Sequence, residues 1–235
     1  TGRYVWDAAI LRFDNRSIDS RWIIGRTIYH NPHVWPNQAA EQPTAAAVYT
    51  TVKRLPLQLD LFYVYKNGWI TSGDARVGDL RSHSLGFWFK KEWGAWNAGA
   101  TVVGQFGRRA DDDIRALGSA LSVARKLDAD GRCLIGAQFI RGSGDKGMHD
   151  GVFNTFDGVF GGADSDLYGW MNLFFWKNLQ EYRLDVNLRP ISKVRVVGEY
   201  HYFMLDNARD AWYFTGGAQR IDPLGTSGRQ LGHEI

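Results

Sequence analysis

The sequence is poor in the residues on which several protein classes depend. It contains one cysteine, Cys133, and six prolines among 235 residues. A single cysteine excludes an internal disulfide and any metal site built from several cysteines. We expect Cys133 to pack as a small hydrophobic residue in a strand. No apolar run approaches the roughly 20 residues that a transmembrane helix requires, so none is predicted.

Catalytic and metal-binding motifs are scarce as well. The six histidines show no metal-ligand spacing, and neither G-x-S-x-G nor H-E-x-x-H occurs. Residues 142–147 match G-x-G-x-x-G, but no helix is expected after them, and phosphate binding depends on a helix N-terminus. The acidic clusters at 111–113 and 164–166 lack the rest of a calcium-binding loop. The sequence therefore predicts no enzyme, no bound metal and no cofactor.

Aromatic residues and glycine are abundant instead. The chain has 27 Gly, 10 Trp, 10 Tyr and 13 Phe, a composition typical of all-β proteins. Its net charge of +3 is too small to imply nucleic acid as a partner. The mean hydropathy of −0.33 is compatible with a membrane protein whose strands turn only alternate side chains to lipid.

The segments between the turns have the two-faced pattern of β-strands. They lie at residues 3–14, 22–30, 46–54, 57–66, 80–93, 95–107, 114–127, 132–142, 179–189, 193–205 and 229–235. The links after the odd-numbered segments are short, whereas those after the even-numbered ones are mostly longer, at 31–45, 67–79, 108–113, 143–178 and 206–228. A transmembrane β-barrel has one tight rim and one rim of exposed loops. We therefore predict an all-β fold, a transmembrane antiparallel β-barrel forming a single domain over residues 1–235.

Residues 182–202 show the alternation best. One face of the first strand of this pair carries Tyr182, Leu184, Val186 and Leu188, and the other carries Arg183, Asp185, Asn187 and Arg189. After a turn at 190–192, one face carries Val194, Val196, Tyr200 and Tyr202, and the other carries Arg195, Glu199 and His201. A period of two places these sets on opposite sides of a sheet, and the tight turn predicts an antiparallel hairpin.

A soluble antiparallel sheet with one solvent-exposed face would explain the alternation in any single strand equally well. Nothing in the sequence supplies helices or a second sheet to cover so much apolar surface, and aromatic residues gather near strand ends, as in the girdles of barrels. Some segments fit poorly. Arg26 lies on the same face of its predicted strand as its apolar neighbours. It therefore lies near a rim of the barrel, a bulge shifts the register of the strand, or the assignment of the two faces is reversed. In residues 114–127 the alternation of apolar and polar side chains is weak, so a helix is an alternative to the predicted strand there.

The longer links have distinct compositions. Residues 31–43 carry three prolines and are expected to form an irregular loop. The link at 143–178 includes the strongly apolar stretch 167–176, which we expect to fold into the mouth of the barrel or to lie on its rim.

The polar face of the strands is mainly basic. It carries Lys53, Lys66, Lys90, Arg109, Lys126, Arg183, Arg189 and Arg195, with Asp60, Asp185, Glu199 and His201 among them. Cations around a narrow tube favour anions, and a few acids keep the binding weak enough for passage. The alternative is an ordinary polar lumen whose charges pair across it. The neighbouring Glu199 and His201 are interpreted as lining rather than as an acid–base pair.

No signal peptide opens the sequence, and the last expected strand still continues at Ile235. An odd number of strands, about eleven, is also unusual for a bacterial barrel. We therefore expect the chain to be an incomplete portion of a longer protein.

Several pieces resemble a known family. Residues 154–157, 168–174, 176–179, 200–205, 210–213 and 232–235 are similar to the alginate export family of outer-membrane barrels. The resemblance implies a bacterial outer-membrane barrel of about eighteen strands, surrounded by outer-membrane lipid, with an arginine-rich constriction that passes an anionic polysaccharide outward. It also implies a plug loop and periplasmic partner proteins of a secretion complex.

On this resemblance, Arg183, Arg189, Arg195 and Lys53 are expected to contact polymer carboxylates, with Asp185, Glu199 and His201 lining the same passage. Arginine suits such contacts because its planar fork binds a carboxylate through two hydrogen bonds.

Three other functions stay open. A general or small-anion porin would share the fold without a polymer substrate. An outer-membrane hydrolase would need a nucleophile and a base at one rim, for which no motif occurs. A structural or adhesive component of an outer-membrane assembly would have a closed lumen.

Overall fold

The computed structural model describes residues 5–29, 38–70, 78–147, 150–158, 168–214, 219–221 and 228–235. Eleven long or terminal strands follow one another: β1 (Val5–Asp14), β2 (Ile18–Tyr29), β3 (Gln38–Val52), β4 (Gln58–Ile70), β5 (Gly78–Trp93), β6 (Trp96–Arg109), β7 (Asp112–Lys126), β8 (Cys133–Gly142), β10 (Leu179–Ile191), β11 (Val194–Leu205) and β14 (Gln230–Glu234). The short strands are β9 (Val152–Phe153), β12 (Trp212–Tyr213) and β13 (Gln219–Ile221). None of the described residues forms a helix long and apolar enough to cross a membrane.

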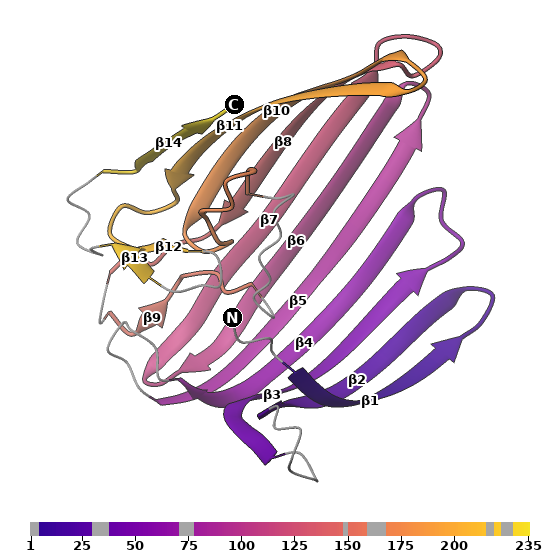
Figure 1. The fold of residues 1–235 in the computed structure, drawn as a ribbon. Helices are drawn as coiled ribbons and strands as arrows, with labels where there is room; N and C mark the ends of the chain where they lie inside the picture. Colours follow the sequence, from indigo (N-terminus) through magenta and orange to yellow (C-terminus); the bar gives the residue numbers. More distant parts are fainter. Residues whose placement is uncertain are drawn as a thin grey trace.

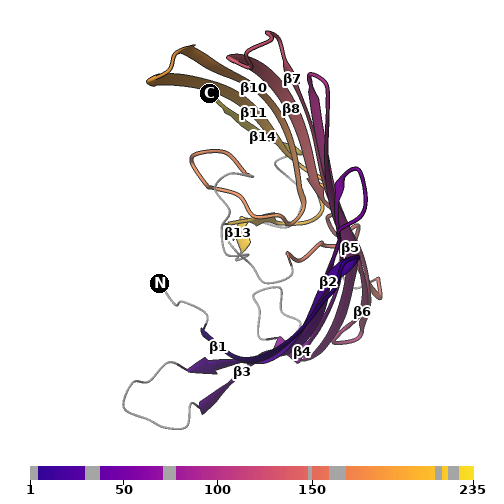
Figure 2. The ribbon, with the colours of Figure 1, turned by 90° about the vertical axis from the view of Figure 1, so that its right-hand side faces the viewer.

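The strands form one curved antiparallel sheet. Its order is β1-β2-β3-β4-β5-β6-β7-β8-β10-β11-β14, with β9 paired to β7 in parallel, while β12 and β13 form a separate two-stranded sheet. In the described residues β1 and β14 do not pair with each other, so the sheet is open. It curves like part of a barrel wall (Figures 1 and 2), and the described part of the chain between β8 and β10 contacts its concave side.

The predicted all-β antiparallel fold is confirmed, and the predicted strands match those observed closely. Two local expectations were wrong, and one alternative that had been left open is now decided. The link after β6 is a turn of two residues, Ala110 and Asp111, rather than a longer loop. Residues 114–127, predicted as a strand with a helix left open, lie largely in strand β7, so the strand prediction is confirmed. Strand β3 already begins at Gln38, within the stretch expected to be irregular, of which residues 31–37 lie outside the described part.

The backbone hydrogen bonds explain how a strand can include that proline-rich segment. Between Arg26 and Ile28 of β2 the pairing jumps from Thr44 to Ala39 on β3. The four residues in between, which include Pro43, therefore bulge out of the ladder. Proline has no N–H to give to a neighbouring strand, so a bulge is a position that it tolerates.

The contacts of the link between β8 and β10 identify the inner face of the sheet. Lys66 of β4 and Gln105 of β6 reach Asp157 of that link, and Phe156 packs with Val103 of β6. Alternation then assigns the other positions: even residues of β4, β5, β7 and β8 and odd residues of β3, β6, β10 and β11 lie on the inner, concave face.

The opposite, convex face is apolar and exposed. On β5 it carries Leu85 and Phe87, and on β10 it carries Leu184, which is 61% exposed. Further exposed apolar side chains of this face are Leu61, Leu117, Leu121, Val123, Ile135, Tyr182, Val186, Leu188, Val196 and Tyr200. Water-soluble proteins rarely expose so large an apolar surface, and the outward band of a membrane barrel has this composition.

Arg26, which fitted the alternation poorly, does lie on the convex face. It pairs across the sheet with Asp7 of β1, whose carboxylate is 3.9 Å from the guanidinium. It lies next to the register shift, three residues before the end of β2. Its position near the end of the strand, next to the bulge, explains how a charged side chain occurs on the apolar face.

The core lies on the concave side, between the sheet and the link at 143–178, hereafter the inward loop. One cluster joins Tyr168 and Phe174 of this loop to Ile140, Leu179 and Phe203 of β8, β10 and β11. A second joins Phe156 to Val103, Ile114 and Ala116 of β6 and β7. The apolar stretch predicted at 167–176 thus folds onto the wall, although Leu167 and residues 159–166 lie outside the described part.

Candidate functional site: the inner face and the inward loop

Strands β10 and β11 bring four of the predicted site residues together. Arg183 pairs across the sheet with His201, and Asp185 with Glu199, all on the inner face. The guanidinium Nε of Arg183 is 3.5 Å from Oδ1 of Asp185. The predicted alternation of this hairpin is therefore correct at each of these positions.

His201 is the centre of a buried acidic cluster. Its Nδ1 lies 2.6 Å from Oε1 of Glu181 and its Nε2 lies 3.4 Å from Oε2 of Glu199. Both His201 and Glu181 are almost inaccessible to solvent. Sequence reasoning missed Glu181, although it shares the parity of Arg183, and extending the alternation by one step would have found it.

The same cluster holds the end of the inward loop. Glu199 accepts a hydrogen bond of 2.5 Å from the indole N–H of Trp170. Glu234 of β14 accepts the backbone N–H groups of Trp170 and Met171 at 2.5 and 3.2 Å. Two strands of the wall, β11 and β14, thus present acceptors to one turn of the loop. Glu234 was not predicted to take part.

Arg189 and Arg195 lie at the other end of the same hairpin, next to the tight turn. Arg195 donates a hydrogen bond of 3.1 Å to Oδ1 of Asn187. In the part of the chain that the structure describes, neither arginine side chain has an ion-pair partner. Both are exposed, and they supply unpaired positive charge at the tight-turn end of the inner face.

Lys53 is not close to this hairpin. It follows β3 directly, and its Nζ pairs with the carboxylate of Asp14 on β1. With Asp60, Trp88, Lys90 and Glu92 it lines a hollow of about 640 Å³ on the inner face at the tight-turn end. The predicted site residues therefore belong to two separate regions of the wall.

A third charged group lies where the inward loop crosses the centre of the sheet. Asp157 is 2.8 Å from Nζ of Lys177 and 3.3 Å from Nζ of Lys66. Burial alone would raise the pKa of the Asp157 carboxyl, but the charges of Lys177 and Lys66 outweigh it and hold that pKa well below its usual range. The carboxylate is therefore ionised at neutral pH.

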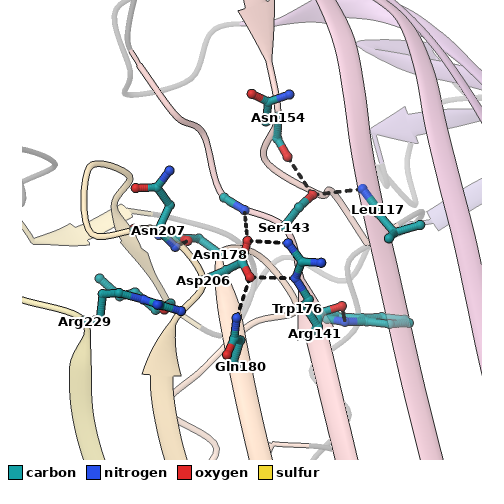
Figure 3. Close-up of polar contacts among 12 residues, drawn as sticks. Leu117, Arg141, Ser143, Asn154, Trp176, Asn178, Gln180, Asp206, Asn207 and Arg229 are labelled. Carbon is teal, nitrogen blue, oxygen red and sulfur yellow. Dashed lines mark hydrogen bonds and ion pairs between the residues drawn. The ribbon is translucent and has the colours of Figure 1, made fainter.

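Polar contacts anchor both ends of the inward loop, as Figure 3 shows. Asp206 accepts hydrogen bonds from Arg141 Nε and Gln180 Nε2, each at 2.6 Å, and from the backbone N–H of Gly144 at 3.2 Å. The hydroxyl of Ser143 donates to the Asn154 carbonyl at 2.7 Å (Figure 3). Burial would raise the pKa of Asp206, but the bonds from Arg141 and Gln180 lower it.

Two further buried side chains complete the anchor. Asn178, which adopts a positive φ of 46°, donates to the carbonyl groups of Asn207 and Ala211 at 2.9 and 3.0 Å. Asp210 accepts the hydroxyl protons of Thr155 and Tyr213 at 2.6 and 2.9 Å. Burial raises the pKa of Asp210 despite these bonds. Because Thr155 belongs to the inward loop, these contacts tie the loop to the segment after β11.

The geometry is that of a wall with an apolar convex face, a charged concave face and a fixed internal loop. A family model for alginate export matches residues 37–235. The chain belongs to the alginate export family. No curated protein matches it.

The alginate export family consists of outer-membrane proteins that transport polysaccharide. The match extends well beyond the pieces that carried the resemblance, since it includes strands β3 to β8. The inner-face positions of Lys66, Lys90, Arg109, Lys126 and Asp60 agree with their predicted facing. Many of the cations are paired with acids, as in Lys90 with Glu92 at 3.0 Å, so the wall is less uniformly positive than a bare ring of arginine and lysine.

Proposed function

We propose that the chain forms the wall of a channel in the bacterial outer membrane that lets an anionic, alginate-like polysaccharide pass outward. The observation that carries this proposal is the separation of the two faces of the sheet. Exposed apolar side chains cover the convex face, while cations recur on the concave face from the tight turns to the inward loop. Lipid suits the first face, and a hydrated polyanion suits the second.

The arrangement of charges supports a stepwise passage. At the tight-turn end Arg189 and Arg195 have no carboxylate partner in the described residues and can take the first uronate carboxylates through bidentate hydrogen bonds. Further along, cations such as Arg183 are close to acids such as Asp185. There a polymer carboxylate replaces the acidic side chain that already lies beside the cation. Each such site therefore binds the polymer weakly and releases it readily.

The passage needs no catalytic group and no cofactor. Polymer synthesis and the concentration gradient supply direction, and proteins of a periplasmic secretion complex deliver the polymer. On this proposal the chain has lipid and polysaccharide as partners and no nucleic acid. The roles of Arg183, Arg189, Arg195, Lys53, Asp185, Glu199 and His201 are proposed as contacts along this path.

The proposal is tested by charge reversal in planar lipid bilayers. Arg183→Glu combined with Arg195→Glu should lower the selectivity for anions, seen as a shift of the reversal potential toward that of a cation-selective pore. Oligouronates should block the wild-type current. An unchanged reversal potential would argue against the proposed lumen face. Anion selectivity without any block by oligouronates would instead indicate a small-anion porin.

A further inference from the structure

The group formed by Lys66, Asp157 and Lys177 has the composition of a carboxylate-binding site that is already filled. Each oxygen of the Asp157 carboxylate meets a different lysine, at 2.8 Å for Lys177 and 3.3 Å for Lys66. The two lysines come from separate elements, one from the wall strand β4 and one from the end of the inward loop. Two cations thus converge on one anion that the chain itself supplies.

The backbone of Asp157 is fixed independently of its carboxylate. The side-chain amide of Gln105 donates to the Asp157 carbonyl at 2.6 Å and accepts the Asp157 N–H at 2.8 Å. The neighbouring Phe156 is completely buried. Gln105, Phe156 and the contacts of Asp206 and Asp210 also hold the loop, so it stays anchored by them when the carboxylate of Asp157 leaves the lysines.

The surroundings would keep the lysines in place if the carboxylate left. Nζ of Lys177 lies 5.7 Å from the ring centre of Phe175 and 5.4 Å from that of Tyr213. Aromatic faces attract an ammonium group and limit its motion. The side chain of Asp157 is 39% exposed, whereas those of Lys66 and Lys177 are 14% and 17% exposed, so the carboxylate is the most accessible part of the group.

We propose that Lys66 and Lys177 form a binding site for a carboxylate of the passing polymer, and that Asp157 is a tethered competitor for it. This inference rests on the proposed function for the identity of its ligand. An incoming uronate takes the position between the lysines while the Asp157 side chain turns toward water. No bond is made or broken, and the exchange of one carboxylate for another prevents the polymer from binding so tightly that it stalls.

The test compares two variants that each remove one negative charge from the loop region. Asp157→Asn removes the carboxylate that lies between the two lysines, whereas Asp206→Asn weakens the anchor at Arg141 and leaves that carboxylate in place. Current block by an oligouronate and by monomeric glucuronate is measured on the complete protein in planar bilayers. We expect about tenfold tighter block of Asp157→Asn by both probes, with wild-type values for Asp206→Asn. Adding Lys66→Gln to Asp157→Asn should abolish the gain.

The outcomes separate this inference from the proposed function. Equal block of all variants would contradict the role of Asp157 as a competitor for the lysine site. An equal increase in blocking affinity in both single variants would contradict it as well, because a loosened loop alone explains that result. If glucuronate blocks Asp157→Asn more tightly than the wild type while the oligouronate blocks no variant, the result supports the carboxylate site and contradicts polymer export. If the oligouronate blocks every variant equally, the result supports polymer export and contradicts the role of Asp157 as a competitor.

Discussion

Gly118 of β7 shows, at the scale of single residues, how closely the inward loop approaches the wall. A Cβ atom at this position would lie 2.4 Å from Cζ of the Phe156 ring, which is buried against the sheet. A side chain in that position must displace the ring or the strand, because the surrounding cluster leaves little free space. The absence of a side chain at residue 118 is therefore what allows the loop to pack here.

Gly118→Ala is expected to destabilise the packed loop by about 1–3 kcal/mol, the usual range for overpacking. Gly198→Ala is the matched control, because a Cβ there would have no atom within 4 Å. Protease cleavage within the inward loop of the folded protein provides the measurement. Faster cleavage of Gly118→Ala than of Gly198→Ala is expected, and equal rates would show that Phe156 does not hold the loop.

Two acids of the loop anchor respond to pH in the same direction. Burial raises the pKa of Asp206 and of Asp157, but their cationic partners lower both below the usual value. A carboxyl whose pKa is lowered by folding stabilises the folded state above its unfolded pKa of about 3.9, and this contribution is lost as the pH falls through the folded value. For Asp145 and Asp210 burial raises the pKa, so acidification affects their contribution in the opposite sense.

The contacts of Asp206 and Asp157 should therefore weaken below about pH 4 and stay intact at neutral pH. Hydrogen exchange of the amides at 154–157 and 174–178, corrected for the intrinsic pH dependence, would measure the effect. In Asp206→Asn part of the protection should already be missing at neutral pH, and the further loss in acid should be smaller. Protection in the wild type that is the same at pH 3 and pH 7 would contradict this assignment.

At the scale of the elements, the strands were predictable because their pattern is local. In β10 every second residue from Tyr182 to Leu188 is apolar, and a tight turn fixes the register with β11. The facing of Arg183 and His201 therefore followed from the sequence alone. The contacts of the inward loop were not predictable in this way. Lys66 and Asp157 are 91 positions apart, and no period in the sequence relates them. Glu234 and Trp170 meet for the same non-local reason.

The two faces of β10 should respond oppositely to the same substitution. Leu184→Arg puts a charge on the convex face and is expected to destabilise the protein by about 2–4 kcal/mol if that face lies at the lipid midplane. Asn187→Arg adds the same charge to the inner face and should cost much less. Unfolding by urea in lipid vesicles compares the two variants. Equal losses of stability would mean that the convex face is not in contact with lipid.

At the scale of the whole molecule, a curved antiparallel sheet (Figure 2) separates an exposed apolar convex face from a charged concave face, against which the described residues of the inward loop pack. The strand order follows the chain from β1 to β11, so neighbouring strands are also neighbours in sequence. Loops of very different length therefore gather at one end and tight turns at the other. The family assignment and this architecture agree, while the identity of the cargo depends on the chemistry of the inner wall.

The most direct test of the account is cysteine labelling along β10 in lipid vesicles. In a background with Cys133→Ser, single substitutions Tyr182→Cys to Leu188→Cys are treated with a charged, membrane-impermeant thiol reagent from both sides. The account predicts labelling at residues 183, 185 and 187, protection of these positions by an oligouronate, and no labelling at 182, 184, 186 and 188. Labelling at every position, or only at the even-numbered ones, would contradict a wet concave passage surrounded by lipid.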